Sequence, residues 1–163
     1  MTALTVDELL AWLDQTSNGW RGLVQRHPEV LAFPCSTRET QNVAELLQHI
    51  VAVELRYAER LRDLSETSYD QIAFDTADAI FTTHARTMDL LQPLLQRDAE
   101  FWDGTIEFMT RSAGQMRARR RAILVHLAMH AIRHYAQLAT LVREHGVAPG
   151  WQMDYLFAVA EPA

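Results

Sequence analysis

The sequence contains no lysine and only one cysteine, Cys35. All 15 basic side chains are arginines, against 21 aspartates and glutamates, and the formal net charge of −6 argues against a general nucleic-acid-binding surface. A single cysteine excludes an intramolecular disulfide and is typical of a reducing compartment. No apolar run approaches the roughly 20 residues that cross a bilayer, and no basic and then apolar leader is apparent. We therefore expect a cytoplasmic protein that binds neither nucleic acid nor membrane.

Most of the chain shows the apolar spacing of amphipathic helices. We expect long helices over residues 6–27, 43–64, 76–95 and 120–146. Capping residues support the first two starts, at Thr5 with Glu8 and at Asn42 with Glu45. Four such segments without a strong strand pattern predict an all-α protein, a four-helix bundle forming a single domain over residues 1–163.

The stretches outside these helices have weaker patterns. Residues 98–111 are predicted to be a connector with a short strand or turn. Ser112 and Gln115 form a further capping box, which offers the last helix an alternative start. The apolar residues of 151–159 are expected to pack against the helices.

Three histidines lie four residues apart in the last expected helix, at His126, His130 and His134. Four residues advance a helix by only about 40° around its axis and about 6 Å along it. Two imidazoles at this spacing can therefore converge on one metal ion. On a helical wheel His130 and His134 lie at or near the edge of the apolar arc, whereas His126 lies on the polar side. We predict His130 and His134 as ligands, and His126 as a group that orients a ligand or faces solvent.

The second expected helix carries His49 with nearly the same offset from its apolar stripe. Because bundles build metal sites from side chains on facing helices, His49 is predicted to face His130 and His134. Glu54 falls within the stripe, so its carboxylate needs a partner if buried, either a ligand imidazole that it orients or an arginine. The remaining histidines are expected to be ordinary surface groups, because none shares a face with a second candidate ligand: His27, His84 and His145.

The run HLAMHAIRHYAQLATLVREHG resembles the last-helix signature of the DinB/YfiT-like metalloenzymes, a family named for DNA-damage-inducible proteins. His49 followed by Glu54, in LLQHIVAVELRYAERL, is similar to the histidine-then-acid pattern of the family. The resemblance implies that His49, His130 and His134 bind one divalent metal ion, and it adds Gln137 as a group behind the ligands. Many members continue the last histidine with Arg-Gly-Gln, whereas this chain continues with Tyr-Ala-Gln.

Three imidazoles leave a divalent ion with open coordination positions, which in zinc proteins marks a catalytic site. The resemblance implies either a transferase or isomerase in which the metal activates a low-molecular-weight thiol, or a hydrolase in which it activates water. We favour thiol S-transfer to a small-molecule substrate, with zinc or nickel as the metal, in a homodimer. The alternatives are a non-catalytic metal-binding or stress-response protein, and a protein that has kept the fold and lost the metal.

An arginine cluster precedes the last helix, at Arg117, Arg119, Arg120 and Arg121. Cations at this end of a helix face the positive end of its dipole, so the cluster needs an explanation. One interpretation is a solvated face, or acidic partners on another helix. The other is an anion clamp, with Arg117 and Arg120 holding the carboxylates of a thiol cofactor or substrate.

Overall fold

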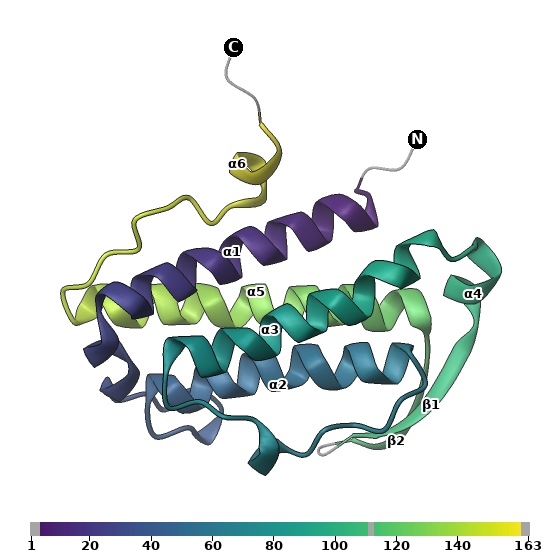
Figure 1. Cartoon of the computed structure of the whole chain (residues 1–163), viewed down its shortest axis with the longest axis horizontal. Coiled ribbons are helices and arrows are strands. Elements are labelled where there is room, and N and C mark those ends of the chain that lie inside the picture. Colours follow the sequence, from purple (N-terminus) through teal and green to yellow (C-terminus); the bar gives the residue numbers. More distant parts are fainter. Residues whose placement is uncertain (1–3, 111–112, 161–163) are drawn as a thin grey trace.

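The computed structural model describes residues 4–110 and 113–160, and the chain is mostly helical (Figure 1). Its long helices are α1 (Val6–Arg26), α2 (Val43–Leu61), α3 (Ala77–Leu91) and α5 (Arg120–Glu144). Helix α2 packs against both α3 and α5, and α1 packs against the same two helices. Short helical segments join or follow them: η1 (Pro28–Ala32), η2 (Thr37–Glu39), η3 (Tyr69–Gln71), η4 (Gln92–Gln96), α4 (Ala99–Asp103) and α6 (Tyr155–Val159). The expected helical class is confirmed.

The helices begin where the capping residues predicted. The Glu8 amide donates to Thr5 Oγ1 at 3.2 Å, and the Thr5 amide donates back to Glu8 at 2.8 Å. Asn42 Oδ1 accepts from the Glu45 amide at 3.0 Å at the start of α2. Helix α2 ends at Leu61, three residues earlier than expected, because Asp63 adopts a left-handed conformation with φ of 53°. These caps fix where α1 and α2 begin.

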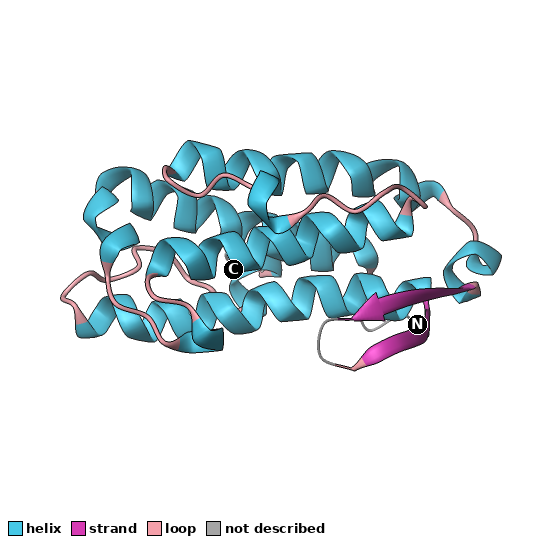
Figure 2. Cartoon of the chain, turned by 90° about the horizontal axis from the view of Figure 1, so that it is seen from below, coloured by secondary structure: helices cyan, strands magenta, loops and turns pink. Residues whose placement is uncertain are grey.

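A β-hairpin precedes the last helix. Its first strand lies within residues 98–111, where a short strand or turn was expected, whereas the all-α prediction did not include its second strand. Strand β1 (Thr105–Thr110) pairs antiparallel with β2 (Gly114–Arg119), and Figure 2 shows the hairpin along one side of the helices. Alternate residues of β1 are exposed and half-buried, the period-2 pattern of a strand. The alternative helix start was therefore wrong for Gln115, which pairs with Met109 across the hairpin; Ser112 lies outside the described residues.

The core lies between the long helices: α1, α3 and α5 each have a buried and an exposed face, whereas α2 has no exposed residue. Trp20 of α1 stacks on Tyr135 of α5 with ring centroids 6.0 Å apart. The segment before α6 closes over this pair, since Trp151 meets Trp20 edge-on at 5.5 Å and the indole of Trp12 donates to the Met153 carbonyl at 2.7 Å. Packing of the C-terminal segment is thus confirmed for Trp151 and Met153, whereas Leu156, Phe157 and Val159 are exposed. None of the described helices combines the length and apolarity needed to cross a membrane.

Gly19 leaves the space that the Trp151 indole fills, because a Cβ atom at residue 19 would overlap the ring. We expect Gly19→Ala to displace Trp151 and to lower the free energy of unfolding by about 1–3 kcal/mol, as overpacking does. The matched control is Gly22→Ala on the same helix, whose nearest neighbour is the flexible Arg26 guanidinium at 3.2 Å. Its effect should be neutral or stabilising, because alanine favours helix. Urea denaturation measures both, and equal stability of the two variants would contradict the assignment.

Candidate metal centre

Three histidines meet where α2 and α5 pack together. His49 comes from α2, and His130 and His134 come from successive turns of α5. One nitrogen atom from each ring lies within 4.8 Å of the other two, so the three side chains could hold a metal ion. The Nε2 atoms of His49 and His130 are 3.3 Å apart, and the ring centroids of His130 and His134 are 4.5 Å apart. The structure therefore brings together the three residues that the sequence selected.

The distances and hydrogen bonds of this cluster suit a divalent ion. Two imidazole nitrogens bound tetrahedrally to one zinc ion lie about 3.3 Å apart, and the His49 and His130 nitrogens have that separation. Nδ1 of His134 lies 2.6 Å from Gln137 Oε1, an acceptor, so Nδ1 carries the proton and Nε2 is left as the donor atom for a metal. Gln137 thus stands behind His134, where it holds the ring and its tautomer.

The imidazoles of His130 and His134 are in the protonation state that metals bind. Burial, followed by the neighbouring His134 and His49, lowers the pKa of His130 to about 2. Burial also lowers the pKa of His134, with the Gln137 hydrogen bond opposing it and the positive charges of Arg133 and Arg38 adding to it. Neutral imidazole offers a lone pair, so little proton competition opposes metal binding by these two rings at neutral pH.

His126 lies one turn before His130 and is not one of the three converging histidines. Its ring packs 5.6 Å from the His130 ring and 5.3 Å from the Tyr57 ring, measured between centroids. The side chain is largely exposed and lines a cavity beside the cluster. It is therefore placed to touch His130 and the cavity rather than to complete the ligand set.

Glu54 lies away from the metal cluster. Five residues turn a helix by about 140°, so Glu54 faces α1 and α3 while His49 faces α5. Its Oε2 accepts from His84 Nδ1 at 2.6 Å, and His84 Nε2 donates to Asp14 Oδ1 at 3.2 Å. The suggested roles for Glu54, orienting a ligand or pairing with an arginine, are replaced by a pair with a histidine.

The prediction of His84 as a surface group was wrong, because it is only 3% exposed. Its helix buries residues at helical spacing, and His84 falls on that buried face with Ile80, Thr87 and Leu91. When the apolar stripes of two consecutive helices each contain a titratable residue, the pattern indicates that these two residues pair in the core. That pattern was present in the sequence at Glu54 and His84.

A cavity of about 860 Å³ adjoins the histidine cluster. Its lining includes His49 and His130 from the cluster, Tyr57 and Tyr69 from the α2 side, and Phe108 from the hairpin. A metal ion held by the histidines would therefore be within reach of a molecule in this cavity. The size suits a small organic ligand, since such sites commonly measure about 300–1,000 Å³.

Neither arginine proposed as an anion clamp lines this cavity. Arg120 lies 3.2 Å from Asp63 Oδ2, and its guanidinium sits over the Phe101 ring at 4.7 Å. Arg117 is exposed on β2, directly across the hairpin from Glu107. Acidic residues lie beside both Arg117 and Arg120. They support the first interpretation of the arginine cluster, in which its charges face solvent or acidic partners.

These observations define the class of protein. It is a mostly helical protein in which two packed helices bring three histidines together beside a cavity. The sequence model of the DinB family matches residues 1–161, and the chain belongs to this family. The resemblance inferred from the histidine pattern is thereby confirmed. No curated protein matches the sequence significantly.

Proposed function

We propose that this protein is a divalent-metal-dependent enzyme that transfers a low-molecular-weight thiol to a small-molecule substrate. His49, His130 and His134 would hold the metal, with zinc or nickel suited to imidazole ligands. The observation that carries the proposal is the position of the cluster, since two of its three rings line a cavity large enough for a substrate. A site built only for structural metal would be closed by a fourth protein ligand.

A divalent ion at such a site supplies Lewis acidity, which lowers the pKa of a water or thiol that binds it. The chain's own residues do the rest. Gln137 Oε1 holds His134 by accepting a hydrogen bond from its Nδ1. The half-buried ring of Phe108 and the side chain of Ile123 give the cavity apolar walls that would exclude water from a bound substrate.

The test combines elemental analysis of protein purified without a histidine tag with a turnover assay. We expect about one divalent ion per chain and, on mixing with a thiol and an electrophile, turnover that disappears after chelation and returns when zinc or nickel is restored. Turnover that needs metal but no thiol would instead indicate a hydrolase. Stoichiometric metal without turnover of either kind would indicate a non-catalytic metal-binding protein, and absence of binding would overturn the proposal.

A further inference from the structure

We propose that Arg38 and Arg133 form a binding site for a carboxylate group of the molecule that occupies the cavity beside the three histidines. This rests on the proposed function for the role of that molecule, and it deepens the function by naming the charge that the site recognises.

The cavity is lined by more positive than negative side chains. Four arginines contribute to its walls, Arg38, Arg56, Arg60 and Arg133, whereas Glu39 is the one carboxylate among the described lining residues. This contrasts with the chain as a whole, whose formal net charge is −6. A local positive surface on an acidic protein attracts anions selectively to that place.

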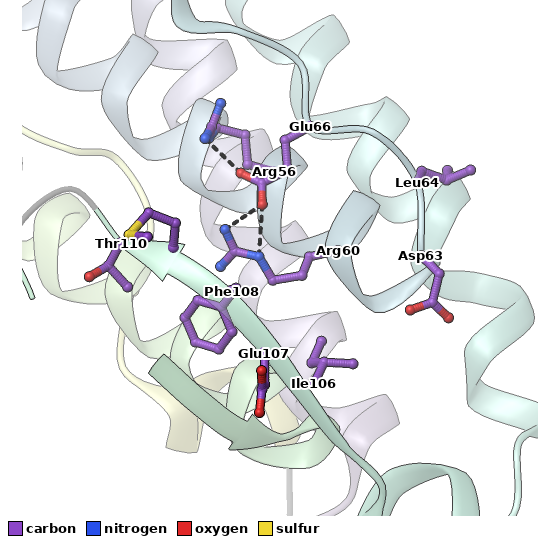
Figure 3. A pocket seen from close by; sticks show the side chains of 10 residues that line it. Arg56, Arg60, Asp63, Leu64, Glu66, Ile106, Glu107, Phe108 and Thr110 are labelled. Carbon is purple, nitrogen blue, oxygen red and sulfur yellow. Dashed lines mark hydrogen bonds and ion pairs between the residues drawn. The ribbon is translucent and has the colours of Figure 1, made fainter. Parts of the chain in front are cut away.

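Two of the four arginines already share a carboxylate partner within the protein. Figure 3 shows Arg56 and Arg60 both turned toward Glu66. Arg56 lies 2.6 Å from Glu66 Oε2, and Arg60 Nε donates to Glu66 Oε1 at 2.9 Å. The Arg60 guanidinium also lies over the Phe108 ring at 4.3 Å. These two side chains therefore form part of the cavity wall, and Glu66 both fixes them in place and balances one of their two charges.

Arg38 and Arg133 are different. Within residues 4–110 and 113–160, neither forms an ion pair with a carboxylate. Arg133 approaches His134 Nε2 at 3.4 Å, and Arg38 lines the same cavity as Arg133. Two arginines from distant parts of the chain, η2 and α5, therefore line the cavity beside the histidines without an ion-pair partner in the described residues.

The backbone holds Arg38 in place. Arg38 and the following Glu39 both adopt left-handed conformations, with φ of 58° and 64°. This region is unfavourable for residues with a side chain, and such strained positions cluster at functional sites. The turn is fixed by Thr40, whose hydroxyl donates to the Thr37 carbonyl at 2.7 Å. A strained but anchored turn that presents a charged side chain to a cavity is consistent with a binding role.

A carboxylate is the ligand that these features select. A guanidinium offers a planar fork of N–H donors that matches the two oxygens of a carboxylate. The rest of the ligand would lie against the apolar walls at Val53, Phe108 and Ile123. A bound carboxylate would also offset the repulsion that Arg38 and Arg133 exert on a cation at the histidines. Metal and carboxylate should therefore each strengthen the binding of the other.

The experiment titrates the metal-free full chain with butyrate and, separately, with its neutral isostere butyramide, following the histidine ring signals by NMR. We expect butyrate alone to bind, and its Kd to rise about tenfold in Arg38→Gln and again in Arg133→Gln, as for loss of a charge-assisted hydrogen bond. Arg117→Gln is the matched control, with the same change of charge outside the cavity, and should bind like the wild type. Equal binding of butyrate and butyramide, equal Kd in all variants, or equal weakening in Arg117→Gln would overturn the proposal.

The test of carboxylate binding is independent of the test of metal binding. Because butyrate binding is measured without metal, it can succeed when metal binding fails, and the reverse. A second arm uses cobalt-loaded protein and asks which molecule carries the carboxylate. If the thiol carries it, 3-mercaptopropionate should give a sulfur-to-cobalt absorption band at about tenfold lower concentration than 2-mercaptoethanol, and Arg133→Gln should remove that advantage. If the other substrate carries it, both thiols should behave alike and butyrate should bind together with them.

Discussion

His130→Ala is expected to lower the affinity for a divalent metal by at least about 100-fold, since loss of a group that merely orients a ligand already costs about 10–100-fold. His130 is the centre of the cluster. Its Nε2 atom lies 3.3 Å from Nε2 of His49, and His134 follows it by one helical turn. Metal binding to the wild type should raise its melting temperature, because the ion binds only the folded chain. His130→Ala should lose that metal-dependent increase.

Two neighbours on the same helix serve as graded controls. Gln137→Ala removes only the acceptor for His134 Nδ1, so we expect a loss of affinity of about 10–100-fold. His126→Ala touches none of the three converging nitrogens and should bind metal like the wild type. Competition with a chromogenic chelator measures all three affinities. Equal affinities in His130→Ala and His126→Ala would refute the ligand assignment.

The histidine cluster was predictable because its geometry is local. His130 and His134 share a helix, so their convergence follows from helical spacing alone. To predict His49 as their partner, only the rotation of α2 about its axis had to be known, and the apolar stripe of α2 fixes that rotation. Gln137 followed from the resemblance, and the structure places its oxygen 2.6 Å from His134.

The features that the sequence did not reveal have weak local signatures. A short strand or turn was expected within residues 98–111, where β1 lies, but β2 was not expected, because its arginines continue into the helix that follows. The placement of Arg38 depends on two consecutive left-handed residues, neither of which is glycine. No local rule predicts that conformation, since steric preference opposes it.

The buried pair of Glu54 and His84 leads to the second large effect. Glu54 is fully buried, and it contacts a histidine whose other nitrogen contacts Asp14, so both ring nitrogens donate and the ring carries a positive charge. Glu54→Gln keeps the volume but removes the charge that balances this imidazolium. Because a buried charge left without its partner destabilises strongly, we expect the free energy of unfolding to fall by about 3–5 kcal/mol. Asp14→Asn, at a half-exposed carboxylate with a longer contact, should cost about 1 kcal/mol.

The dependence of stability on pH tests the same charge. Burial alone would lower the pKa of His84, but the charges and hydrogen bonds of Glu54 and Asp14 outweigh it and raise the pKa to about 9. A folded pKa above the unfolded value of about 6.5 contributes stability that is fully present below pH 6.5 and is lost as pH rises through about 9. The lowered pKa values of His130 and His134 affect stability in the opposite direction and only below pH 6.5. They therefore do not change the decline in stability expected between pH 6.5 and about 9. Urea denaturation from pH 6 to 10 should therefore show a decline in wild-type stability that Glu54→Gln largely lacks, and parallel profiles for the two proteins would show that His84 is not held as an imidazolium.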